Sequence, residues 1–190
     1  WVLIASFENH TGEAIFDGTL EYALERELSN SRFVNVVPHE RVADTVELMR
    51  QPPATPITPA VGREVALRDG GIRVLLTGRV EKLDNTYLLS VALVNPTSGA
   101  TVRSFSEEAT GQREVVAALR RLSGQVRETL GEALPEIQKT VQELEKVTTP
   151  SLRALQLFSQ ADSMMRQGRA EQALAEGLLR GHEAEREQED

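Results

Sequence analysis

The start of the chain passes from an apolar run to a polar loop and then to an amphipathic stretch. Residues 2–7 form the apolar run, and its length and β-branched content predict a strand buried on both faces. Residues 8–13 have the composition of a turn. Asp17 is the expected N-cap of the next helix, because a short polar side chain can accept from a free backbone N–H group. The apolar stripe of that helix consists of Leu20, Ala23, Leu24 and Leu28.

The next part of the chain repeats the order of strand and helix. Residues 33–37 are a second apolar run that a proline ends, and residues 39–50 have helical periodicity. A proline-rich connector over residues 51–59 leads to a helix that begins near Pro59 and ends at residues 69–71. The residues of the 39–50 helix that we expect to face inward are Val42, Val46 and either Leu48 or Met49.

Three strands are predicted in the middle of the chain. Residues 72–83, 87–94 and 100–110 each show strand-like alternation, and they are separated by turn sequences at residues 84–85 and 95–99. These short connections predict an antiparallel meander, whereas the two earlier strands are each followed by a helix and should be parallel. The predicted fold class is α/β with α+β character, a five-stranded mixed sheet with packed helices, followed by a long helix and a C-terminal helical hairpin.

Residues 112–146 form the longest stretch with helical periodicity. We expect the first half to cover the sheet and Pro135 to kink or split the helix, because proline cannot donate the helical hydrogen bond. The second half is expected to pack on the C-terminal helices of the same chain. The alternative is a homodimer formed through the 112–146 helix.

The C-terminal part predicts two short helices, at residues 151–167 and 169–179, separated by Gly168. The spacing is typical of a tetratricopeptide-type hairpin. We therefore divide the chain into an α/β domain at residues 1–147, a tetratricopeptide-like hairpin at residues 148–180 and an acidic disordered tail at residues 181–190.

Composition and charge limit the kinds of function. The chain has no cysteine and only three histidines, which excludes thiol catalysis and disulfides and disfavours a zinc site. The formal net charge of −8 argues against nucleic acid as a partner. No stretch is apolar enough to span a membrane, so any membrane attachment should come from a segment upstream of Trp1. We expect no cofactor and no metal.

The 8–18 loop and the terminal hairpin are the regions most open to interaction. Ile15 and Phe16 are apolar residues in a polar loop, where they either anchor the loop or contact a partner. The loop lacks the glycine patterns that cradle phosphate, and its carboxylates lack a nearby base or nucleophile, so we predict no catalytic residue. The candidate interaction residues are Glu8, Asn9, His10, Thr11, Ile15, Phe16, Phe158 and Met165.

Three segments of the chain resemble a known family. Residues 2–37, 67–109 and 130–161 resemble the TolB-like amino-terminal domain found in the extracytoplasmic region of bacterial membrane serine/threonine kinases, running into tetratricopeptide repeats. The most specific parts are the phrases FENHTGEAIFDGTLE and TTPSLRAL. The chain lacks the motifs of the kinase domain itself.

The resemblance implies a noncatalytic sensory or interaction module that regulates a membrane kinase by binding a protein, a peptide or another ligand. It implies an extracytoplasmic location on a single-pass membrane protein, with a cytoplasmic location left open. Two alternatives remain at this point. One is a structural component of a cell-envelope assembly, and the other is a nucleotide-binding or hydrolytic domain that uses the 8–18 loop.

Overall fold

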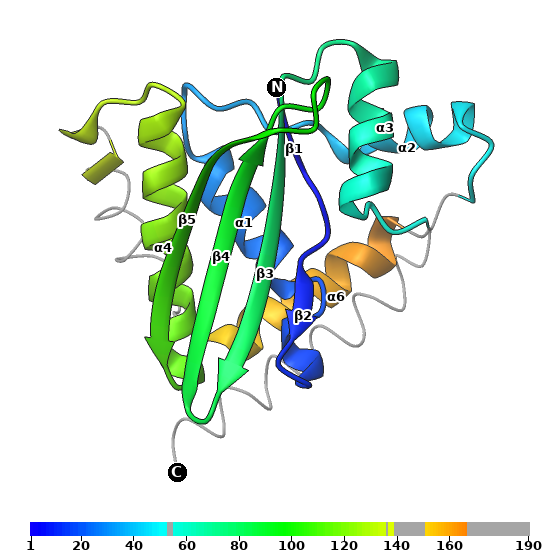
Figure 1. The fold of residues 1–190 in the computed structure, drawn as a ribbon. Helices are drawn as coiled ribbons and strands as arrows, with labels where there is room; N and C mark the ends of the chain where they lie inside the picture. Colours follow the sequence, from blue (N-terminus) through cyan, green and yellow to red (C-terminus); the bar gives the residue numbers. More distant parts are fainter. Residues whose placement is uncertain (53–54, 136, 139–150, 167–190) are drawn as a thin grey trace.

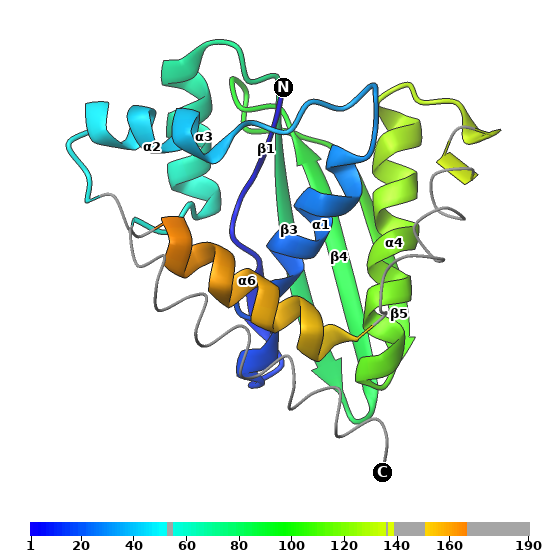
Figure 2. The same cartoon turned by 180° about the vertical axis from the view of Figure 1, so that it is seen from behind.

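The computed structural model describes residues 1–52, 55–135, 137–138 and 151–166. It contains a five-stranded mixed sheet with packed helices, which confirms the predicted fold class. Figure 1 shows the sheet in front of α1 (Thr19–Ser29) and α6 (Leu152–Arg166), with α4 (Gln112–Thr129) beside β5. Seen from behind, α1, α4 and α6 lie over the same face of the sheet (Figure 2).

The sheet is organised around β3 (Val74–Leu83). On one side, β3 pairs in antiparallel fashion with β4 (Thr86–Val94), and β4 pairs with β5 (Thr101–Thr110), as the alternation predicted. On its other side, β3 pairs in parallel with β1 (Val2–Ile4) and then with β2 (Glu8–His10). The two short strands therefore follow one another along the same edge of β3.

The fifth strand is not the one that the apolar pattern predicted. Residues 33–37 form a single parallel bridge, Val2 to Val36, and are otherwise irregular. The polar segment Glu8–His10, which we expected to be a turn, forms β2 instead. The physical reason is the length of β3, since β1 pairs only with its first residues and the backbone groups further along still require partners.

A glycine allows the chain to pass from β1 to β2 close above the sheet. The Phe7 ring lies over Gly78 of β3, and a Cβ atom at Gly78 would stand 2.2 Å from ring atom Cε1. A glycine inside a strand commonly marks such a close approach. The connection between β1 and β2 therefore packs directly onto the middle of β3.

Helix α1 begins later than predicted. Its N-cap is Gly18, with a φ of 71°, and no side chain caps it. Asp17 follows the 3-10 turn η1 (Ala14–Phe16), and its carboxylate accepts a hydrogen bond from Asn9 instead of from the helix. The prediction of Asp17 as the N-cap is wrong because that carboxylate is used inside the 8–18 loop.

A small apolar cluster lies between the β1 end of the sheet and two helices, α2 (His39–Leu48) and α3 (Pro59–Asp69). Helix α3 begins as predicted, with Pro59 in the first turn, and ends at Gly70, whose φ is 71°. Of the two alternatives in α2, Met49 packs on this cluster and Leu48 is exposed. The buried members are Leu3, Ala5, Val37, Val42, Val46, Val65, Ala66, Ile72 and Leu75.

The larger apolar cluster lies between the opposite face of the sheet and helices α1, α4 and α6. It includes the predicted stripe of α1 and the alternate residues of β4, and the first half of the long helical stretch covers the sheet as expected. Its central members are Leu20, Leu24, Leu28, Leu76, Val80, Tyr87, Leu89, Val91, Leu119, Leu122 and Val126.

The long helix ends before Pro135. Helix α4 stops at Thr129, and the chain turns at Gly131, whose φ is 102°. The turn brings Glu132 back to Arg127, with two hydrogen bonds of 2.8 and 2.5 Å, and both side chains are buried. A continuous helix through this point is excluded, because a residue with a φ of 102° cannot belong to a right-handed α-helix.

Helix α6 matches the first helix of the predicted hairpin. The predicted second helix at residues 169–179 and the acidic tail lie outside the described residues, as does the 139–146 part of the long helix. The division of the chain into domains at residues 147 and 180 stays a prediction.

Candidate functional site

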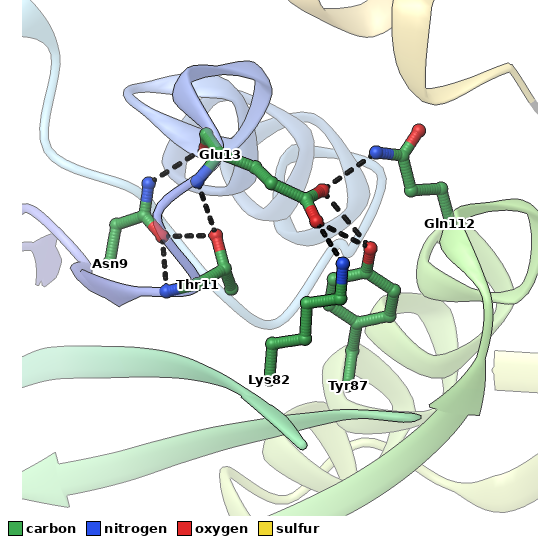
Figure 3. A network of polar contacts seen from close by, with 6 residues as sticks. All are labelled: Asn9, Thr11, Glu13, Lys82, Tyr87 and Gln112. Carbon is green, nitrogen blue, oxygen red and sulfur yellow. Dashed lines mark hydrogen bonds and ion pairs between the residues drawn. The ribbon is translucent and has the colours of Figure 1, made fainter. Parts of the chain in front are cut away.

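The 8–18 loop is held by hydrogen bonds among its own residues (Figure 3). Asn9 Nδ2 donates to the Glu13 carbonyl at 3.0 Å and to Asp17 Oδ1 at 2.6 Å. Asn9 Oδ1 accepts from both the backbone N–H and the hydroxyl of Thr11, at 3.0 and 2.7 Å. The Thr11 hydroxyl oxygen in turn accepts from the Glu13 N–H at 3.0 Å. Asn9 and Thr11 therefore define the shape of the loop.

The Glu13 carboxylate fixes the loop to the sheet and to α4 (Figure 3). It accepts hydrogen bonds from Lys82 Nζ, from the Tyr87 hydroxyl at 3.0 Å and from Gln112 Nε2 at 2.7 Å. The bond from Lys82 is the main reason that the pKa of Glu13 lies below its usual value. The same bond raises the pKa of Lys82, so both charges are favoured.

The two apolar residues of the loop point into the larger cluster. Phe16 is buried, and its ring centroid lies 5.2 Å from that of Tyr87. Ile15 is half-buried and packs on the same cluster. These positions are those that an anchor requires.

Glu8 and His10 differ from the rest of the loop because they lie on β2 and are exposed. Their Cα partners in the parallel register are Arg79 and Glu81. Arg79 lies 2.7 Å from Glu8 and 3.8 Å from Glu81, while His10 Nε2 is 3.9 Å from Glu8. The side chains of β2 thus continue a charged row that begins on β3.

This row is part of a sheet face that the described helices cover only at one end. We use the name open face for the side of β2 to β5 that points away from α1, α4 and α6 (Figure 1). Helix α3 covers this side only where β3 begins, near Leu75. Ser90 and Ser106 lie opposite each other on it, with their hydroxyls 2.9 Å apart. The residues of the open face include Glu8, His10, Thr77, Arg79, Glu81, Leu88, Ser90, Ala92, Ser104, Ser106 and Glu108.

Sequence reasoning did not single out the open face. Its signal is the polar residues at alternate positions of the last strand, Ser104, Ser106 and Glu108, together with Ser90 between apolar residues of the strand before it. Those positions were visible in the alternation, but a face becomes a surface only when neighbouring strands are placed in register.

Phe158 and Met165 lie elsewhere, on α6, which covers the helix side of the sheet and is in front of it in Figure 2. Their exposed fractions are 57% and 52%. The other side of α6 contacts the start of α1, where the Ser159 hydroxyl donates to the Gly18 carbonyl at 2.9 Å. Gln156 lies 3.5 Å from the Ala14 carbonyl on the same side. The structure therefore does not bring the two predicted groups of interaction residues onto one surface.

One buried carboxyl group lies near the site without joining its network. Glu21 Oε1 accepts from the Phe7 N–H at 2.5 Å, whereas Oε2 is buried and has no hydrogen-bond partner among the described residues. Burial raises the pKa of Glu21, because removal from water disfavours the charged form. The contact links the start of α1 to the chain that leads into β2.

The described residues lack two further features. They contain no cluster of three or more histidine, aspartate or glutamate side chains that could hold a metal ion. None of the helices in the same part of the chain is both long enough and apolar enough to cross a membrane.

Comparison with known proteins gives structural neighbours only. No family model matches the chain, and no curated protein matches it. The C-terminal domains of LpoB from Salmonella enterica and from Escherichia coli each match with a TM-score of 0.51 at 17% identity, covering 57% of this chain and 81% of the LpoB chain. Lipoprotein GNA1162 from Neisseria meningitidis matches more weakly, with a TM-score of 0.46 at 16% identity, covering 70% of this chain and 97% of that protein.

The match to the LpoB C-terminal domains contradicts the resemblance to TolB-like domains of membrane kinases. Two of the three segments that carried the resemblance form a strand–loop–helix unit and a β-meander. Such local patterns do not identify one family. Over the part of the chain that aligns, the protein shares the fold of the LpoB C-terminal domain.

Proposed function

We propose that this chain is a noncatalytic component of a bacterial cell-envelope assembly that binds another protein through the open face. The observation that carries the proposal is a broad polar sheet face on a domain with the fold of the LpoB C-terminal domain. The structural neighbours favour the cell-envelope alternative over kinase regulation. An extracytoplasmic location is part of this proposal.

The chemistry of the open face suits a protein surface. Its central side chains are hydroxyls and short apolar groups, which lose little conformational freedom when a partner covers them. The charged row at β2 and β3 contains both signs, with Arg79 between Glu8 and Glu81. Such a row can fix the orientation of a partner, because opposite charges align and like charges repel.

The alternative of a nucleotide-binding or hydrolytic loop has no supporting observation. A phosphate cradle needs backbone N–H groups that are free to bind the ligand. In the 8–18 loop, the N–H groups of Thr11, Glu13 and Phe16 already donate within the loop. The Glu13 carboxylate is likewise used to hold the loop in place.

Site-specific photocrosslinking in cells that make the parent protein would test the proposal. A photoreactive amino acid at Thr77 or Ser90 should give a discrete protein adduct in the envelope fraction, because both positions lie on the open face. The same probe at Asp44, an exposed position of α2, is the matched control.

Protease treatment of spheroplasts would show on which side of the membrane the chain lies. Digestion of this region in intact spheroplasts is the expected result. Protection from protease, together with no adduct from either open-face position, would refute the proposal.

A further inference from the structure

Strand β5 is the last strand in the sheet order, so one of its two edges has no neighbouring strand among the described residues. Two side chains of α4 reach backbone groups at the C-terminal half of this edge. Glu114 accepts from the Thr110 N–H at 2.8 Å, and Arg121 Nη2 lies 3.3 Å from the Glu108 carbonyl. These bonds show that the even-numbered residues of β5 direct their backbone groups away from β4.

Backbone direction alternates along a strand, so Ser104 and Ser106 also direct their N–H and C=O groups outward. The short contact between the hydroxyls of Ser90 and Ser106 agrees with this, because side chains come closest where paired residues do not exchange backbone hydrogen bonds. No other described segment bonds to the backbone of Ser104 or Ser106. In the C-terminal half of the β5 edge, side chains of α4 therefore bond to the outward backbone groups, whereas in the half around Ser104 and Ser106 these groups are open to another strand.

The side chains of β5 are self-complementary in charge. Arg103 makes no ion pair with any described residue, whereas Glu107 lies 2.6 Å from Arg121 Nε and accepts a hydrogen bond from Gln125 Nε2 at 2.8 Å. A second copy's Arg103 would therefore join an existing pair. Arg103 lies four residues before Glu107, with Phe105 midway between them, and all three side chains point to the helix side of the sheet. If two copies of β5 pair in antiparallel fashion about Phe105, each Arg103 stands opposite the partner's Glu107.

The same register also satisfies the backbone. It places Ser104 opposite the partner's Ser106, and both residues direct their N–H and C=O groups outward, as a hydrogen-bonded antiparallel pair requires. Moving the register by one pair in either direction would instead place Arg103 opposite the partner's Phe105 or the partner's Ala109. Charge and backbone direction therefore select one register.

We propose that two copies of this chain associate through β5, in the register centred on Phe105, to form one continuous sheet. This goes beyond the proposed function, because it concerns the outward backbone groups of β5 and a second copy of this chain, whereas the open face presents the side chains of the sheet to another protein. Exposed strand edges are ready templates for another strand, and an exposed segment with complementary charges favours a second copy of itself over an unrelated peptide.

Sedimentation equilibrium of the whole chain tests the association. The wild-type chain should change from a monomer of 21.0 kDa to a dimer as its concentration rises. Ser106→Pro removes an outward N–H and should leave a folded monomer, because proline is tolerated on edge strands. Ser106→Ala keeps the N–H, loses the same hydroxyl and should dimerise like the wild type.

Charge reversal and crosslinking test the register. Arg103→Glu should weaken the dimer roughly tenfold or more, because it sets two glutamates against each other at each end. The chain has no native cysteine, so Ser104→Cys and Ser106→Cys variants can be mixed and oxidised. The mixed disulfide should form faster than either homodimeric one.

Three results would overturn the proposal. They are a wild-type chain that stays monomeric at all concentrations, unchanged dimerisation of both Ser106→Pro and Arg103→Glu, and no preference for the mixed disulfide. Circular dichroism identifies a variant that fails to fold, and Arg103→Glu then decides the outcome, because it alters only an exposed side chain.

Discussion

The two ends of α4 are both held by a glutamate and a basic residue, but in different surroundings. At the N-terminal end, Gln112 joins Glu13 and Lys82, whose side chains are 24% and 32% exposed. At the C-terminal end, Arg127 and Glu132 are 1% and 3% exposed. The first network can exchange its partners for water, and the second cannot.

This difference determines what each network contributes. Glu132 accepts two hydrogen bonds from Arg127 and a third from the Ser31 hydroxyl at 2.5 Å. Ser31 follows α1, so the buried pair ties the end of one helix to the end of another. A buried ion pair adds little net stability compared with an apolar pair, yet removal of one partner is costly because the other charge stays buried. The half-exposed network should respond far less.

The largest effect is expected from breaking the buried pair. Glu132→Ala leaves the Arg127 guanidinium buried without its carboxylate and should lower the free energy of unfolding by about 3–5 kcal/mol. Urea denaturation followed by circular dichroism measures this change. Replacing both residues, Arg127→Met with Glu132→Leu, should recover much of the loss. A double variant no more stable than Glu132→Ala would show that the charge is not the cause.

Acid should weaken both networks. The hydrogen bonds from Arg127 hold the pKa of Glu132 below its usual value, and those from Lys82 do the same for Glu13. The unfolded chain then binds more protons in acid, so the stabilisation is present above the ordinary glutamate pKa and is lost as the pH falls through the folded-state values. The melting temperature measured between about pH 7 and pH 3 checks this, because that range roughly brackets the titration of glutamate. A Glu132→Gln variant should show a shallower decline than the wild type.

A smaller effect is expected at the exposed end. Glu13→Gln keeps the shape of the side chain but removes the charge that Lys82 contacts, and it should cost about 1 kcal/mol. Urea denaturation gives the global value, and limited proteolysis should show faster cleavage within the 8–18 loop. Gln112→Ala is the matched control, because it removes one neutral donor. A loss as large as that of Glu132→Ala would contradict the comparison.

The smallest effect is expected for an ion pair on the surface of α3. Arg68 Nη2 lies 2.7 Å from Glu64, one helical turn earlier, and the two side chains are 50% and 52% exposed. Arg68→Ala should change the free energy of unfolding by at most about 0.5 kcal/mol. This variant gives the baseline for the other two pairs. A larger change in the free energy of unfolding would mean that the exposure of an ion pair does not determine the order of the three effects.

The sequence predicted best those elements whose pattern is caused by burial. The meander of β3 to β5 and the apolar stripe of α1 were visible because one face of each element packs on the core. The first half of the long helix was recognised for the same reason. Such periodicity arises wherever an element has an inner and an outer side.

The errors have a different origin. The fifth strand is formed by residues 8–10 and not by residues 33–37. The choice depends on which part of the β3 edge is left unpaired, and a local sequence pattern does not indicate this. Helix α4 ends early because Glu132 folds back onto Arg127. The open face as a whole was not recognised for a similar reason, although the candidate residues Glu8 and His10 lie on it. Asn9 and Thr11 are polar because the loop bonds to itself, whereas the open face exists only once four strands are aligned.

Gly78 lies under the chain segment that leads into the charged row of the open face. Because the Phe7 ring occupies the space of a side chain at this position, even a methyl group would have to lift the ring away from β3. The residue after Phe7 is Glu8, which begins β2 and contacts Arg79 on the opposite side of the sheet. Replacement of the Gly78 hydrogen by a methyl group would therefore displace residues 7 and 8. It would shift the surface that a partner would bind.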